Sequence, residues 1–157
     1  MTPPVEEVRA AEGFFELGLY RDAWDHLERI SPPGRDHPAA SALCLDILGA
    51  LGRWDDAARW GVGYCKEWPE HGVLFLKTAT AFMRLDDYRP ASDLLSRGPE
   101  TLREQAEYYY LAARCSSRLG KIKEAKVALQ ACFERDKSYR QLALDDADLE
   151  PVWRSLA

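Results

Sequence analysis

The feature that most constrains the fold is a pattern of leucine, turn residue and alanine that returns every 34 residues. Its first copy covers residues 17–27 and reads L-G-L-Y-R-D-A-W-D-H-L. Four leucines and four alanines keep this register without an insertion: Leu17, Leu51, Leu85 and Leu119, and Ala23, Ala57, Ala91 and Ala125. A fixed period of this length indicates a stack of similar units, each of which buries its apolar face against a neighbour.

Each unit is predicted to consist of two helices joined by a tight turn, because apolar residues follow helical spacing on both sides of the turn. The turn holds a residue that tolerates left-handed backbone, namely Gly18, Gly52, Asp86 or Gly120. The alanine lets the second helix approach the first. A bulky residue follows each turn and is expected to wedge between units: Tyr20, Trp54, Tyr88 and Ile122.

The predicted helices cover residues 5–17, 21–30, 38–51, 54–68, 71–85, 88–97, 101–119 and 121–134. Pro3 and Pro4 begin the first helix, and the proline-rich residues 31–38 separate the first unit from the second. Thr101 and Glu104 have the spacing of a capping box. Gly61 and Gly63 lie inside a helix, where each glycine costs about 1 kcal/mol against alanine. Either neighbouring helices approach closely there or the helix is irregular, and we favour close packing.

The pattern changes after residue 138. A short helix over 139–144 and a polar turn over 145–148 precede an apolar stripe of helical spacing: Leu149, Val152, Trp153 and Leu156. We expect Asp148 to cap this last helix and Pro151 to lie in its first turn. Such a helix would cover the apolar face that a stack of repeats leaves open. Asp145, Asp146, Asp148 and Glu150 lack the glycine and glutamate of a calcium loop, which favours a solvated turn.

Composition sets limits on the function. The chain has 157 residues and a net charge of −5, which argues against a general nucleic-acid binder, because such proteins need a basic face. No basic segment followed by an apolar run starts the chain, and no apolar stretch approaches the roughly 18 residues that span a bilayer. We therefore expect a single cytoplasmic domain over residues 1–157 and no membrane partner.

Catalytic and metal-binding motifs are not evident. Cys44, Cys65, Cys115 and Cys132 show no C-x-x-C spacing and are expected to be reduced, buried thiols, with one disulfide or a metal pair as alternatives. The three scattered histidines favour surface or capping roles over metal ligation. The sequence shows no nucleophile elbow and no phosphate loop. It thus predicts no metal, no cofactor and no enzyme activity.

The repeated residues resemble the tetratricopeptide repeat (TPR), a helix–turn–helix unit of 34 residues. The resemblance covers residues 4–37, 38–71, 72–105 and 106–139, with residues 140–156 as the C-terminal cap. The alanine of the second helix is present in all four units, whereas the first-helix tryptophan of the family is replaced by Glu7, Ser41, Phe75 and Tyr109. The resemblance implies an all-α, right-handed solenoid of four units with a capping helix.

TPR proteins typically bind a peptide or a partner helix in a groove lined by the first helix of each unit. Mapping the family's groove positions onto this chain gives Val8, Glu12, Phe15, Glu16, Asp46, Lys77, Thr80, Arg84, Tyr110, Arg114 and Arg118. The acidic positions lie in the first two units and the basic ones in the last two. This asymmetry either orients a peptide with an acidic segment toward the fourth unit or is a solvated surface without specific meaning.

The resemblance implies a non-catalytic scaffold or adaptor that binds a protein segment or, as a homo-oligomer, a second copy of the chain. A small bacterial secretion-type TPR chaperone that holds a client protein is the alternative. Those chaperones usually carry three repeats after a helical extension, whereas this chain begins directly with the first of four. Val8 and Glu12 stand where TPR clamps for heat-shock chaperone tails have lysine and asparagine, so that function is not carried over.

Overall fold

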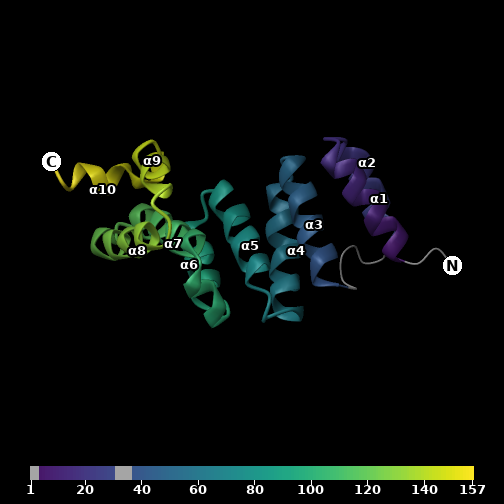
Figure 1. The fold of residues 1–157 in the computed structure, drawn as a ribbon, viewed down its shortest axis with the longest axis horizontal. Helices are drawn as coiled ribbons and strands as arrows, with labels where there is room; N and C mark the ends of the chain where they lie inside the picture. The colour runs from purple at the N-terminus through teal and green to yellow at the C-terminus, as the bar shows by residue number, and fades with distance from the viewer. Residues whose placement is uncertain (1–3, 31–36) are drawn as a thin grey trace. The chain divides into compact units, whose positions relative to one another are not determined.

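The computed structural model describes residues 4–30 and 37–157 of the chain (Figure 1). All regular secondary structure in these two ranges is helical. The predicted break between the first two units lies mostly at residues 31–36, and this part of it, together with the expected helix start at Pro3, falls outside the described residues.

Each predicted repeat contains a pair of α-helices whose ends lie within two residues of the expected ones, except before α7. The helices are α1 (Pro4–Glu16), α2 (Tyr20–Glu28), α3 (Pro38–Ala50), α4 (Trp54–Glu67), α5 (Gly72–Arg84), α6 (Tyr88–Ser96), α7 (Ala106–Arg118) and α8 (Ile122–Arg135). After them come α9 (Tyr139–Leu144), the 3-10 turn η2 (Ala147–Leu149) and α10 (Glu150–Arg154).

The prediction of one continuous helix over residues 101–119 is wrong. A 3-10 turn, η1 (Glu100–Glu104), comes first, and Gln105 has extended backbone with φ −100° and ψ 132°, so α7 begins at Ala106. The capping box is wrong as well, because Thr101 lies inside η1 and no side chain caps that turn. Leu102 is fully buried, and burial of this side chain explains why the segment folds back into a short turn.

The four tight turns are confirmed. Gly18, Gly52 and Gly120 have φ of 76°, 72° and 79°, and Asp86 takes the same left-handed conformation with φ 60°. The four repeated alanines are buried, as close approach of two helices requires. Within the pairs, α1 packs against α2, α3 against α4, and α7 against α8.

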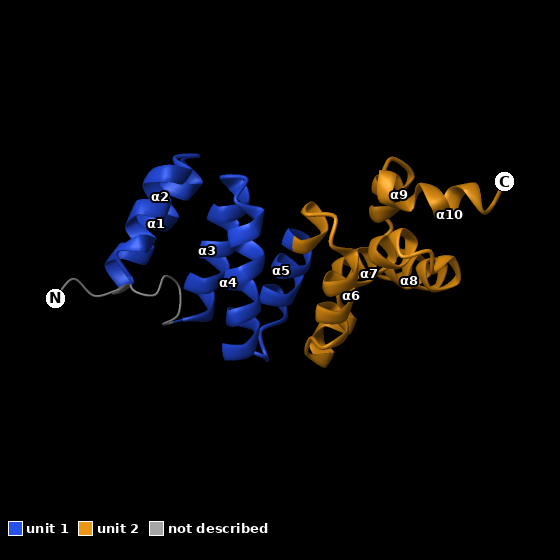
Figure 2. Ribbon diagram, turned by 180° about the vertical axis from the view of Figure 1, so that it is seen from behind, with its two compact units in different colours: residues 1–81 blue, residues 82–157 orange. Residues whose placement is uncertain are grey.

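The chain divides into two compact units, residues 1–81 (unit 1) and residues 82–157 (unit 2), with the boundary inside α5 (Figure 2). In unit 1 the predicted close packing at Gly61 is confirmed. A Cβ atom at this position would lie 2.7 Å from Thr78 Cγ2 and closer still to its Oγ1, so only glycine lets α4 approach α5 in this way. Gly63, by contrast, has no neighbour within 4 Å of such an atom. The single domain expected over residues 1–157 stays a prediction.

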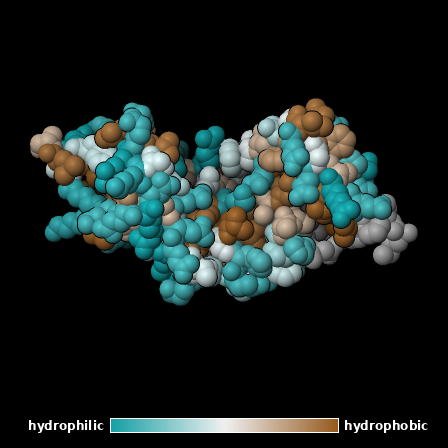
Figure 3. All heavy atoms as spheres, in the orientation of Figure 1, coloured by the Kyte–Doolittle hydropathy of each residue, from teal (hydrophilic) through white to brown (hydrophobic). Residues whose placement is uncertain are grey.

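Unit 2 has a core that joins the fourth repeat to the C-terminal segment. Leu129 and Cys132 of α8 are buried together with Leu149 and Val152, so residues 140–156 do cap the last repeat. Leu156 is 64% exposed and does not share in this core. Exposed leucines of α9 and of the C-terminus leave hydrophobic surface at this end of unit 2 (Figure 3). No helix in the described residues is long and apolar enough to cross a membrane.

Candidate functional site

The predicted groove positions of α1 form an open face of unit 1. Glu12 and Glu16 are exposed, while Val8 and Phe15 are half-buried, and the ring of Phe15 lies 5.4 Å from that of Tyr20. In the described parts of the chain, neither glutamate has a hydrogen-bond or ion-pair partner. This face therefore offers two free carboxylates beside apolar surface.

The remaining groove positions of unit 1 are engaged with other groups of the same unit. Lys77 Nζ of α5 lies 2.5 Å from Asp46 Oδ1 of α3, so these two opposite charges pair with each other. The hydroxyl of Thr80 donates to the carbonyl of Leu76 at 2.9 Å. The sequence placed Asp46 and Lys77 on a charged surface, and the structure brings them together as an ion pair that ties two first helices.

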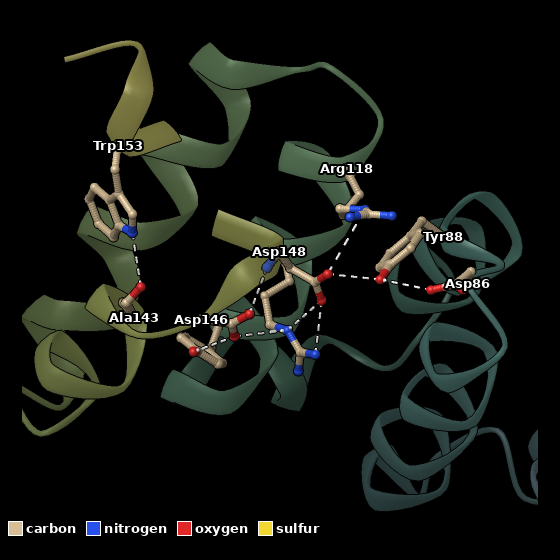
Figure 4. A network of polar contacts seen from close by, with 9 residues as sticks. Asp86, Tyr88, Arg118, Ala143, Asp146, Asp148 and Trp153 are labelled. Atoms are coloured by element: carbon tan, nitrogen blue, oxygen red, sulfur yellow. Dashed lines mark hydrogen bonds and ion pairs between the residues drawn. The ribbon is translucent and has the colours of Figure 1, made fainter. Parts of the chain in front are cut away.

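Unit 2 holds its groove positions in a polar network centred on Asp148 (Figure 4). The guanidinium of Arg114 donates to Asp148 Oδ2 through Nε at 3.1 Å and through Nη2 at 3.0 Å. The hydroxyl of Tyr88, on α6, donates to Asp148 Oδ1 at 2.8 Å. Arg118 Nε lies 3.9 Å from the same oxygen. Asp148 is only 8% exposed, so this carboxylate is enclosed by its partners.

Asp146 extends the network by one more carboxylate. Its Oδ2 accepts a hydrogen bond from the hydroxyl of Tyr110 at 2.7 Å and lies 3.1 Å from Arg114 Nε. Its Oδ1 accepts from the backbone N–H of Asp148 at 2.9 Å. Two guanidinium groups thus face these two carboxylates, and a third carboxylate, that of Asp86, lies 3.5 Å from the hydroxyl of Tyr88.

Two predictions for this segment are corrected. The segment is not a solvated turn, because Asp148 is buried and the side chain of Asp146 is largely so. Asp148 does not cap the last helix either: Asp146 caps η2, and the N-cap position of α10 is Leu149. The physical reason is that Nε and Nη2 of Arg114 both donate to Oδ2 of Asp148, and two hydrogen bonds from a charged group outweigh a single cap hydrogen bond. Pro151 does lie in the first turn of α10.

The tyrosines of the network are held in their protonated form. Burial, followed by the hydrogen bond to Asp148, raises the pKa of Tyr88 to about 12. Burial and the hydrogen bond to Asp146 raise the pKa of Tyr110 further still. Each ring also lies under a guanidinium: Arg118 is 5.0 Å from the centroid of Tyr88, and Arg114 is 5.9 Å from that of Tyr110. The tyrosines are therefore hydrogen-bond donors over the whole physiological range.

Sequence reasoning identified three members of this network, Tyr110, Arg114 and Arg118, and missed the other three. Tyr88 was interpreted as a wedge, and Asp146 and Asp148 as a turn. The sequence signals were a pair of carboxylates two residues apart, Asp146 and Asp148, and, elsewhere in the chain, two arginines one helical turn apart, Arg114 and Arg118. Arg84, the remaining predicted groove residue, is exposed at the end of α5.

The thiols and histidines have structural surroundings. All four cysteines are buried free thiols, and burial raises the pKa of Cys44 to about 11 and that of Cys115 to about 12. His37 Nδ1 accepts from the backbone N–H of Ala39 and caps α3. Within residues 4–30 and 37–157, no three His, Cys, Asp or Glu side chains are grouped as metal ligands.

The fold matches solved TPR structures over most of its length. MamA 41-end from Desulfovibrio magneticus RS-1 has a TM-score of 0.79 at 14% identity, covering 99% of this chain and 90% of that one. YrrB, described as a TPR protein with an unusual peptide-binding site, has a TM-score of 0.71 at 16% identity, covering 92% of this chain and 80% of that one. No family model and no curated protein matches the sequence. The likeness establishes an all-α fold of the TPR solenoid type.

Proposed function

We propose that the chain is a non-catalytic protein-interaction module that binds a segment of a partner protein on the first helices of its repeats. The observation that carries the proposal is the face of α1, where the unpaired carboxylates of Glu12 and Glu16 lie beside the half-buried side chains of Val8 and Phe15. Apolar contacts supply most of the affinity in such interfaces, and charges at their edge select and orient the partner.

This face fits a segment that presents basic side chains around an apolar one. The two glutamates are four residues apart and therefore lie on one side of α1, one helical turn from each other. A partner cation that pairs with either glutamate displaces only water, because no other group of the described chain competes for these carboxylates. The similarity in fold to YrrB, a TPR protein with a peptide-binding site, supports the same class of function for this chain.

Affinity purification from the source organism tests the proposal. The full chain and its Glu12→Lys/Glu16→Lys variant are compared as baits, and we expect a reproducible partner that the variant loses at least tenfold. The matched control is Asp25→Lys/Glu28→Lys, which makes the same charge change at exposed positions of α2. This control variant is expected to retain the partner.

Loss of the partner by both variants would mean that only net charge matters, and retention by both would contradict the proposed surface. Circular dichroism and thermal unfolding establish that each variant is folded. The native mass of the purified chain shows whether the segment is supplied by a second copy, in which case the Glu12→Lys/Glu16→Lys variant dissociates.

A further inference from the structure

We infer that Tyr88, Tyr110, Arg114 and Arg118 form a receptor for two carboxylates spaced two residues apart in an acidic segment of a partner protein, and that the chain's own Asp146 and Asp148 keep this receptor closed. The inference deepens the proposed function, on which it rests, by naming a second binding surface and the chemistry it accepts. It concerns unit 2 alone.

The geometry shows what the receptor recognises. All side-chain donors of the cluster come from α6 and α7, and the side-chain acceptors they share come from the C-terminal segment (Figure 4). Asp148 accepts two hydrogen bonds from the guanidinium of Arg114 at one oxygen, Oδ2, and Asp146 accepts a hydrogen bond from the hydroxyl of Tyr110. Guanidinium and phenol groups in this arrangement bind carboxylates regardless of the chain to which the carboxylates belong.

Backbone conformation adds selectivity for spacing. Asp146 is extended, with φ −83° and ψ 115°, and the turn that follows brings Asp148 back toward the same guanidinium. Carboxylates on adjacent residues of an extended segment would point to opposite sides. An Asp-x-Asp sequence in which the first aspartate caps a turn and the second lies inside that turn therefore fits, whereas an uninterrupted extended acidic segment does not hold two carboxylates in this way.

The resident segment competes strongly because it is tethered. A covalently linked ligand has an effective concentration on the order of millimolar, and the buried side chains of Leu149 and Val152 hold this one in addition. Acidic peptides therefore displace this segment only when they are present at millimolar concentration or above. A partner that supplies both carboxylates and apolar contacts of its own can displace residues 145–149.

The test removes the carboxylates of Asp146 and Asp148 and supplies the same groups on a separate peptide. The probe is a fluorescein-labelled synthetic peptide L-D-D-A-D-L-E, which copies residues 144–150, and its binding is measured by fluorescence polarisation. We expect the full-length Asp146→Ala/Asp148→Ala variant to bind the probe at least tenfold more tightly than the unaltered chain does. Adding Arg114→Gln to that variant should abolish the gain.

The matched control is Asp145→Ala/Glu150→Ala, which removes the same charge from exposed positions of the same segment. This control should bind the probe no better than the unaltered chain. Equal binding of the probe by the unaltered chain, the Asp146→Ala/Asp148→Ala variant and the control would overturn the inference. A gain in affinity that persists when Arg114→Gln is added would overturn it as well. These outcomes do not involve Glu12 or Glu16, so failure here leaves the proposed function of α1 standing, and the two failures can be told apart.

A second measurement applies if the emptied variant does not fold. Hydrogen exchange of the unaltered chain is followed with and without the probe at several millimolar. Displacement predicts at least tenfold faster exchange of the backbone amides in residues 147–152. Unchanged exchange in the presence of bound probe would contradict a shared site.

Discussion

The two units carry the same repeat but differ in what occupies the first-helix face. In unit 1 the carboxylates of Glu12 and Glu16 are open to solvent, and the one ion pair of described groove positions, Asp46 with Lys77, ties neighbouring first helices. In unit 2 the side chains of Tyr110, Arg114 and Arg118 are engaged by the C-terminal segment. Unit 1 leaves the predicted groove positions Glu12 and Glu16 open, and unit 2 covers its predicted positions with part of its own chain.

The difference shows that the last repeat uses both sides of one helix, α7: the apolar side is buried and the polar side is paired. Its apolar side requires a cap, which Leu149 and Val152 supply. The polar side of α7 is then within reach of the segment that leads into that cap, and Asp146 and Asp148 pair with it. Burial of the apolar side of the last repeat and engagement of its predicted groove positions both depend on the same ten residues, 143–152.

The largest effect is expected from Leu149→Ala, which breaks the apolar part of the cap. Leu149 is fully buried, so truncation should lower the free energy of unfolding of unit 2 by about 3 kcal/mol. Urea unfolding measures the loss. The control Leu156→Ala removes an exposed leucine of the same segment and should change stability by less than about 0.5 kcal/mol. Equal effects would mean that the cap is not anchored by Leu149.

Two variants compare the charged pairings of the two units: Arg114→Gln in unit 2 and Lys77→Gln in unit 1. Arg114 is 25% exposed, and its loss leaves two enclosed carboxylates with weaker partners, so we expect destabilisation by about 2 kcal/mol after allowing for solvent screening. The Asp46–Lys77 pair is more exposed, and its loss should cost at most about 1 kcal/mol. Urea unfolding of both variants decides, and a larger effect of Lys77→Gln would reverse the ranking of the two pairs.

Close helix packing in unit 1 is tested by an alanine at each of two glycines of α4. At Gly61 the added Cβ meets Thr78, and the strain exceeds the gain in helix propensity, for a net loss of about 1 kcal/mol. At Gly63 the space is open, and the same change should stabilise the unit by about 1 kcal/mol. Thermal unfolding should therefore shift in opposite directions, and shifts of the same sign would contradict the packing.

Unit 2 is also expected to lose stability at alkaline pH. Because folding raises the pKa of Tyr88 from its ordinary 10.0 to about 12, the folded state keeps a proton that the unfolded chain releases in this range. Stability is therefore fully present below pH 10 and falls as the pH rises toward 12, and Tyr110 adds to the same slope. Urea unfolding at stepwise higher pH measures it, and a Tyr88→Phe/Tyr110→Phe variant should show a flatter decline.

The sequence predicts well what each repeat determines by itself. The turns at Gly18, Gly52, Asp86 and Gly120 depend on backbone conformation within a few residues, and helix ends follow from apolar spacing. The segment before α7 was predicted wrongly, because Thr101 and Glu104 match a capping box whose competitor, burial of Leu102, is a tertiary effect. A local sequence pattern does not reveal tertiary burial of this kind.

The engagement of the arginines lies further beyond a single sequence. Arg114 and Asp148 are 34 residues apart, and Tyr88 and Asp148 are 60 apart. A charge on a predicted helix face is equally compatible with a free binding residue and with an internal ion pair. Only the path of residues 145–149 across α7 distinguishes the two, and that path follows from how Leu149 and Val152 are buried.

The covering of α7 also restricts how this protein can lengthen during evolution. Solenoids grow by duplication of whole repeats, and a new unit inserted after residue 139 would become the last one. Its first helix would then meet Asp146 and Asp148 and would need tyrosine and arginine at the positions now held by Tyr110, Arg114 and Arg118. Duplication of the fourth repeat satisfies this condition at once, whereas duplication of the first would set Glu12 and Glu16 against the two aspartates.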